Sequence, residues 1–467
     1  MWGDEILQRF VDDAPVCVML RAALENCFAP ETLDAIFEQQ TQVQYERELL
    51  FSSLVELMSL VVCRVHPSVH AAYQKKQHEA TVSLKSFYNK LNGMEPTVCR
   101  GLVRHTAESV GQVMAGWPPA EPLLQGHQVK VIDGNHLTGT EHRLGVLRDE
   151  GGAALPGVAV AVLDPDRGLI EDVLVAEDAY TQEVKLCEPI LERLQPRDVI
   201  IADRHYCTSD FLYGVAARQA GFVIRQHMGH LSWQPEGPRR YRGRVASGLI
   251  YEQPLKLTHP QSGAELLVRR ITVELDRATR NGESELHLLT NLSSDVADVE
   301  RVAQLYRQRW TVETAFQQVT TSLRCELDSL GYPPAALFSF CMAVACFNLF
   351  ALILAALGSV HGPETVQNQV SLYYLTDELS GTYRGMMIAI PPSKWTCFQD
   401  LTATQLADQL NEWAQQVDLS SYRKHKRGPK KQNKRPYAGN KHVSTSRLLK
   451  NQQKPPTKEP KSTPSKG

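Results

Sequence analysis

Three polar residues, Tyr306, Arg309 and Glu313, recur at spacings of three and four in the segment LYRQRWTVETAFQQV, residues 305–319. In a helix, residues at these intervals lie on one face. A solvent-exposed charged stripe is the simplest interpretation of such a face. The chemical alternative is that Glu313 helps to hold a metal ion while Arg309 and Tyr306 bind a phosphate.

Two further carboxylates, Asp133 in VIDG and Asp203 in IADR, end apolar segments that are typical of strands. Open α/β sheets place their ligand sites at such strand ends. A turn or a cap explains each aspartate alone, but a carboxylate that closes a hydrophobic strand is costly unless it is solvated, paired or bound to a cation. With Glu313 they supply three hard oxygen ligands, which suit Mg²⁺ or Mn²⁺.

The chemistry that this trio predicts is phosphoryl transfer with two metal ions. Two ions about 3.5–4 Å apart can activate a water or a 3′-hydroxyl and stabilise the leaving oxygen. Arg309 then binds the phosphate with a fork geometry that lysine lacks, and Tyr306 adds a hydrogen bond to the nucleic-acid backbone.

The elements expected around these residues form an α/β fold. Residues 1–125 have helical periodicity, and DNA backbone contact or an ordinary helical bundle explains their basic later part. Strands are expected at 129–133, 142–148, 155–164, 168–177 and 197–203, helices at 181–195 and 209–221, and a further strand at 222–227. Strand, helix and strand in this order predict an α/β layer.

The segment from 229 to 295 shows no helical period. Strands are expected at 248–258 and 265–275, separated from their neighbours by breaks at 234–244 and 280–284. An all-β insertion is therefore expected between 126–228, the first part of the core, and 296–420, which carries the Glu313 helix and a helical C-terminal region.

The charge is distributed unevenly. The formal net charge is only -2, but residues 421–467 hold fifteen Lys or Arg and one acid, Glu459, which leaves a charge of -16 on the first 420 residues. Residues 421–467 are expected to be a disordered basic tail, and either a polyanion partner or simple solubilisation explains their charge.

The ten cysteines include no CxxC pair and no zinc-type spacing, which favours scattered reduced thiols of an intracellular protein. The first ten residues are acidic early and resemble no signal peptide.

One apolar segment, 335–357, is long enough to span a bilayer at ~20 residues. It lacks a flanking Lys/Arg cluster and an aromatic belt, and it carries Asn348 midway. We therefore favour a buried core helix and expect no membrane partner, with a membrane anchor as the alternative.

The chain resembles the DDE transposases of the insertion-sequence-four family over roughly residues 80–350. The resemblance rests on the order Asp133, Asp203, β-rich insertion, Glu313, and on Tyr306, Arg309 and Glu313 at the spacing of the Tyr/Arg/Glu/Lys signature; Trp310 also matches. The pattern has a lysine where this chain has Thr320. Arg324, one turn further on the same face, is the candidate substitute.

The resemblance implies an RNase H-like catalytic core and cut-and-paste movement of a DNA element. Asp133, Asp203 and Glu313 become catalytic metal ligands for two Mg²⁺ or Mn²⁺ ions, and Tyr306 and Arg309 become DNA phosphate contacts. The implied partners are terminal inverted repeats, target DNA and a second copy of the chain in a synaptic complex, with hairpins formed at the excised ends. We expect a bacterial, cytoplasmic and nucleoid-associated protein.

The insertion offers weaker candidates for DNA contact. PRRYRGR places Arg239, Arg240, Arg242 and Arg244 around Tyr241, a combination found on nucleic-acid surfaces and also on solvated loops. Trp233 is explained either by core packing or, as in these transposases, by reception of a flipped base.

Two other functions fit the same residues. A standalone metal-dependent nuclease could use the same three carboxylates, and a non-catalytic DNA-binding descendant of a transposase would account for Thr320. A terminal inverted repeat beside the coding sequence would favour an active element over both.

Overall fold

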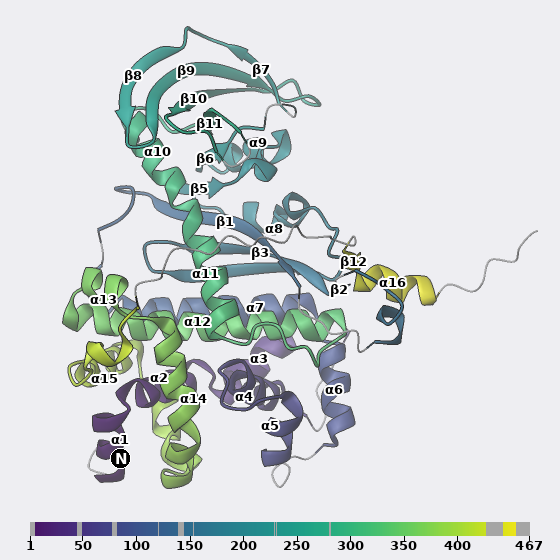
Figure 1. Cartoon of the computed structure of the whole chain (residues 1–467), viewed down its shortest axis with the longest axis vertical. Helices are drawn as coiled ribbons and strands as arrows, with labels where there is room; N and C mark the ends of the chain where they lie inside the picture. Colours follow the sequence, from purple (N-terminus) through teal and green to yellow (C-terminus); the bar gives the residue numbers. More distant parts are fainter. Residues whose placement is uncertain are drawn as a thin grey trace, which may run out of the picture.

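The computed structural model describes residues 5–43, 49–76, 82–119, 121–138, 144–152, 154–227, 229, 231–279, 282–425 and 442–453. Figure 1 shows a central sheet with helices packed below it and a strand-rich end above it. The α/β class expected from the sequence is confirmed.

The main sheet has ten strands in the order β4-β3-β1-β5-β6-β11-β10-β9-β7, with β8 also paired to β9. β1 is parallel to β5 and β5 to β6, and the other pairs are antiparallel. Its strands are β1 (Gln128–Leu137), β3 (Gly157–Asp164), β4 (Leu169–Ala176), β5 (Asp198–Ala202), β6 (Gly221–Arg225), β7 (Ser232–Pro235), β8 (Arg240–Val245), β9 (Gly248–Thr258), β10 (Glu265–Leu275) and β11 (Glu285–Thr290). The strands expected within the β insertion thus continue the sheet of the core through the β6–β11 pair.

Helices precede and follow the sheet. The first group is α1 (Glu5–Asp13), α2 (Pro15–Cys27), α3 (Pro30–Gln40), α4 (Phe51–Val62), α5 (Val69–Lys76), α6 (Leu84–Asn92) and α7 (Pro96–Met114). Within the sheet region lie α8 (Glu188–Leu191) and α9 (Ser209–Ala217). The last group is α10 (Val299–Arg307), α11 (Arg309–Ser322), α12 (Pro333–His361), α13 (Pro363–Gln369), α14 (Leu372–Ala389), α15 (Ala403–Ala414) and α16 (Thr445–Gln452).

The sheet separates two hydrophobic cores because alternate strand residues face opposite sides. Val131 of β1 and Ile201 of β5 join the larger core, which contains the helices α2–α7, α11 and α12. Ile132 and Ile200 join the smaller core with α8 and α9. Strands covered on both faces carry nearly continuous apolar residues, which explains why their positions were predictable.

Helix α12 runs beneath the sheet beside α7 (Figure 1). It is long and apolar enough to cross a membrane by length and composition, and 89% of its most apolar window is buried inside the protein. The core helix of a soluble protein has these same properties. Asn348 is fully buried, and its side chain bonds both backbone groups of Ile170 in β4, at 2.9 and 3.0 Å.

Several expected elements differ from the structure. β1 continues four residues past Asp133, to Leu137, because it pairs with β3 as far as Gly157. The described part of the strand expected at 142–148 contains the short 3-10 helix Gly145–Leu147 instead. The helix expected at 181–195 is a 3-10 turn, Glu183–Leu186, followed by the single turn of α8.

The break expected at 234–244 contains strand β8. Tyr241 pairs with Tyr251 of β9, and Arg242 forms an ion pair with Glu252 at 2.8 Å. These cross-strand contacts stabilise a strand whose glycines and arginines resemble a loop.

The tail expected to be disordered from 421 to 467 contains an ordered segment. Residues 443–444 form β12, parallel to β2 (Ala154–Leu155), and α16 follows. Arg447 binds the carboxylate of Asp178 at 2.7 and 2.9 Å, which anchors this helix to the core. Residues 426–441 and 454–467 lie outside the described residues.

Candidate active site

The register of β1 and β5 brings two of the candidate carboxylates together. Val131 aligns with Ile201 in this parallel pair, so Asp133 and Asp203, two residues further along each chain, stand at matching positions. Val131 and Ile201 face the side of the sheet that α11 covers. The side chains of Asp133 and Asp203 lie on that same side, because residues two apart in a strand point the same way. The sequence predicted that the two aspartates lie close together. It placed Asp133 at the end of its strand, whereas β1 continues to Leu137.

Arg309 joins the third carboxylate to this pair. Its Nη1 donates to Asp133 Oδ2 at 3.2 Å and to Glu313 Oε1 at 2.5 Å. The helical spacing of four residues allows the second bond, and the packing of α11 on β1 allows the first. One guanidinium therefore bridges Asp133 and Glu313.

Tyr306 lies on a different helix from the other two residues of its motif. α10 ends at Arg307, α11 begins at Arg309, and Gln308 between them keeps helical torsion angles of φ -64° and ψ -17°. Burial raises the pKa of the Tyr306 hydroxyl to about 12, and the adjacent Arg309 opposes the shift. Because Gln308 keeps helical torsion angles, the break between α10 and α11 does not separate the two residues. Tyr306 is buried beside Arg309, as expected for a single helix.

Asp133 is a carboxyl that is largely shielded from water. Burial raises its pKa to about 7; Arg309 opposes this shift, and the neighbouring Asp203 reinforces it. The Gly134 N–H also donates to Asp133 Oδ1, at 2.9 Å, which favours the charged form. Burial therefore disfavours the charged form of Asp133, and a cation bound beside it would favour that form.

Asp203 caps the turn that follows β5. It accepts a hydrogen bond from the His205 N–H at 2.7 Å, and its Oδ2 lies 3.0 Å from His205 Nδ1. His205 is exposed, so its ring is accessible to solvent beside the carboxylate. The structure thus makes His205 a direct neighbour of Asp203.

Glu183 is a site neighbour that the sequence reasoning missed. A Cβ added to Gly134 would lie 2.0 Å from Glu183 Cδ, so the carboxylate rests directly against the strand beside Asp133. Because Gly134 faces the opposite side of β1 from Asp133, Glu183 lies behind the site. Tyr206 donates its hydroxyl to Glu183 Oε2 at 3.1 Å, which ties the Asp203 turn to this carboxylate. In the sequence, the glycine after Asp133 was the feature that could have indicated a side chain packed against this strand.

The donor chemistry of the aspartates fits a hard divalent cation. In the described ranges no group of three or more His, Cys, Asp or Glu is arranged to hold a metal ion. The carboxylate of Glu313 is engaged by Arg309, at 2.5 Å. Asp133 is engaged by the same guanidinium, at 3.2 Å.

Trp310 extends from the site into solvent. Its side chain is 60% exposed, and the Arg309 guanidinium lies 4.6 Å from the ring centroid. An exposed tryptophan on a helix otherwise packed by its apolar face offers a flat surface for a ligand.

Thr320 and Arg324 occupy different surroundings. Thr320 is exposed and donates its hydroxyl to the Phe316 carbonyl of the same helix at 2.9 Å. Arg324 lies beyond the end of α11 and donates to the Pro67 carbonyl at 2.5 Å. Arg324 therefore does not sit one turn further on the same helix, because α11 ends at Ser322.

The arginines of the insertion are mostly paired with acids. Arg239 binds Glu274 at 2.5 Å, and Arg242 binds Glu252 at 2.8 Å. Arg240 is exposed, and no ion pair is found for it among the described residues. These pairs stabilise the β8–β10 sheet and reduce the positive charge that was expected to face DNA.

Trp233 lies half-buried on β7. The Arg270 guanidinium stacks 4.7 Å from its ring centroid, and its apolar surface packs against the smaller core. Core packing thus accounts for this tryptophan in the structure.

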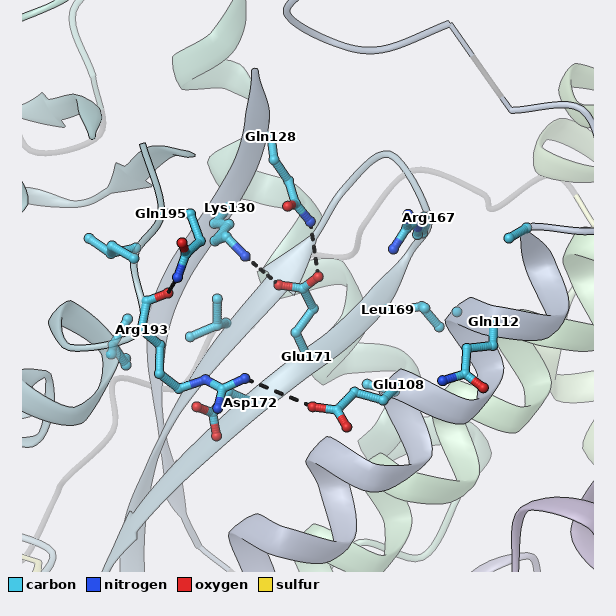
Figure 2. A pocket seen from close by; sticks show the side chains of 16 residues that line it. Glu108, Gln112, Gln128, Lys130, Arg167, Leu169, Glu171, Asp172, Arg193 and Gln195 are labelled. Atoms are coloured by element: carbon cyan, nitrogen blue, oxygen red, sulfur yellow. Dashed lines mark hydrogen bonds and ion pairs between the residues drawn. The ribbon is translucent and has the colours of Figure 1, made fainter. Parts of the chain in front are cut away.

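A separate cleft of about 570 Å³ lies between α7, β1 and β4. Figure 2 shows Glu171 directed toward Gln128 and Lys130, with hydrogen bonds of 3.1 and 2.8 Å. Arg193 and Glu108 pair across it at 3.8 Å. None of the three candidate carboxylates lines this cleft, so it is not the candidate active site.

Comparison with known proteins gives one relevant match. The chain has no match among the curated proteins. Residues 124–349 match the family model described as the transposase DDE domain, and this span contains Asp133, Asp203 and Glu313. Just under half of the chain is therefore similar to the DDE domain of transposases, and this similarity supports a transposase.

Proposed function

We propose that this protein is a cut-and-paste DNA transposase that cleaves and rejoins strands at the ends of a mobile element. The observation that carries the proposal is the bridge from Arg309 to Asp133 and Glu313, with Asp203 beside it. The spacing of Tyr306, Arg309 and Glu313 supports the insertion-sequence-four family and an RNase H-like core.

Asp133 and Asp203 would hold a divalent metal, with Glu313 as the third ligand. Transposase DDE domains generally use divalent metals, which supports Mg²⁺ or Mn²⁺ here. When bound, two such ions supply activation of the attacking oxygen and stabilisation of the leaving oxygen.

Arg309 changes partners when DNA binds. Without DNA its guanidinium neutralises the carboxylates, at 2.5 Å from Glu313. Glu313 accepts one bond, from Nη1, whereas a DNA phosphate offers two oxygens that match the fork of the guanidinium, so it can replace the carboxylate as partner. Arg309 then holds the phosphate beside the freed Glu313, and Tyr306 supports the guanidinium from its buried side.

The assembly that acts would be a dimer that brings two element ends together with target DNA, in the bacterial cytoplasm beside the nucleoid. A non-catalytic descendant is the second candidate, because Thr320 bonds its own helix and leaves no cation at the position of the signature lysine.

The experiment compares duplexes that carry the element end with duplexes in which that end is scrambled. Purified full-length protein is incubated with each duplex in Mg²⁺, Mn²⁺ or EDTA, and the products are sized on denaturing gels. Metal-dependent cleavage at the element end alone supports the transposase. Equal cleavage of both duplexes indicates a standalone nuclease, and binding without cleavage indicates a non-catalytic descendant.

A further inference from the structure

Five cations surround the turn between α4 and α5 and form a basic surface outside the carboxylate site. These residues are Arg64, Lys75, Lys76, Arg324 and Arg384, and we call them the α4–α5 basic surface. They come from the α4–α5 turn, from α5, from the segment after α11 and from α14. Residues far apart in the sequence therefore gather at one place.

Backbone carbonyls hold the arginines of this surface together. Arg64 donates to the Thr321 carbonyl at 2.7 Å, and Arg324 donates to the Pro67 carbonyl at 2.5 Å. Arg384 donates to the Val65 carbonyl. A neutral carbonyl orders a guanidinium without cancelling its charge.

The positive charge of the surface is nearly uncompensated. Within the described ranges Lys76 pairs with Glu56, and no carboxylate partner is found for Arg64, Lys75, Arg324 or Arg384. Burial lowers the pKa of the His66 imidazole within this turn, and Arg384 and Lys75 lower it further. An array of ordered, unpaired cations is the arrangement that binds a polyanion.

The basic surface begins where the candidate catalytic helix ends. Thr321, the partner of Arg64, lies eight residues after Glu313 on α11, which is about 12 Å along a helix. That length corresponds to three or four base pairs of duplex at about 3.4 Å each. The exposed residues of α11 are uncharged, namely Trp310, Thr314, Gln317, Thr320 and Thr321, so no acidic side chain of α11 repels a phosphate backbone between site and surface.

We propose that the α4–α5 basic surface binds the phosphate backbone of duplex DNA a few base pairs from the point of cleavage. This inference rests on the proposed function, since the same DNA must reach Glu313. The N-terminal helices then contribute to DNA binding through this turn.

The test measures DNA affinity against salt concentration with the full-length chain. In the triple variant R64Q/R324Q/R384Q, the slope of log affinity against log salt should fall in magnitude by about 2 to 3, since each phosphate contact contributes about 0.9. The affinity at low salt should fall about 10- to 100-fold. K75Q removes a cation for which no hydrogen bond is found within the described ranges, and it should reduce the slope by about 1.

The control is R218Q, because Arg218 is also exposed and also donates to a backbone carbonyl, that of Glu192. Its slope should equal that of the parent. Parent-like slopes in both K75Q and the triple variant would overturn the inference while leaving cleavage, and thus the proposed function, intact. A parent protein that binds no DNA would instead contradict the proposed function. Competition by an acidic polypeptide with no competition by DNA would identify a protein partner and likewise overturn the inference.

Discussion

Replacing Asn348 with leucine should destabilise the protein, although it makes α12 more apolar. Asn348 is fully buried, and it bonds the N–H and the C=O of Ile170 on β4, the edge strand of the sheet. Leucine leaves both backbone groups unsatisfied at about 1–3 kcal/mol each. The better burial of leucine recovers about 1–2 kcal/mol. With the middle of each range, about 4 kcal/mol is lost and about 1.5 kcal/mol is recovered, so the expected net loss is about 2.5 kcal/mol.

The assay is urea unfolding followed by circular dichroism, with S339A as the matched control. Ser339 lies fully buried in the same helix, and its Oγ has no hydrogen-bond partner in the described part of the chain. S339A should therefore change the free energy of unfolding by less than about 1 kcal/mol. An N348L variant at least as stable as the parent would refute the role given to Asn348. It would also favour α12 as a membrane anchor, for which leucine is the better residue.

Two further predictions concern a buried acid and the exposed tryptophan. Burial raises the pKa of Asp164 to about 6, so its contribution to stability is complete below about pH 4 and is lost as the pH rises through 6. D164N keeps an acceptor for the N–H groups of Asp166 and Arg167 and carries no charge. As the pH rises from 4 to 8, its free energy of unfolding in urea should increase relative to that of the parent by up to about 3 kcal/mol. A decrease relative to the parent over this range would contradict this prediction. W310A should weaken binding of DNA ends by about 1–3 kcal/mol, the value of one stacked base, with the melting temperature unchanged; fluorescence anisotropy measures the first quantity, and unchanged affinity would exclude Trp310 from DNA contact.

Local pattern was sufficient where burial alone determines the structure. The strands 248–258 and 265–275 were predicted with their observed bounds, because apolar and β-branched residues recur between turn signals. The meeting of Asp133 and Asp203 followed from two strand ends in one parallel layer. The position of Arg309 relative to Glu313 followed from helical spacing alone.

Local pattern failed where a distant partner decides the structure. β8 exists because β9 pairs with it, and α16 is held by Asp178, some 269 residues earlier in the chain. Asp133 lies mid-strand because β3 extends the pairing beyond it. Glu183 could not be assigned to the site, because nothing in its own segment indicates that Gly134 makes room for it.

We propose that the carboxylates joined by Arg309 hold the metal ions with which the protein cleaves DNA. The most direct measurement is single-turnover cleavage of a duplex carrying the element end, in Mg²⁺ or Mn²⁺, by the parent and by E313Q, with DNA binding measured on the same samples. E313Q should bind the end as the parent does and leave it uncut. Cleavage at the parent rate by E313Q would exclude Glu313 from the catalytic site.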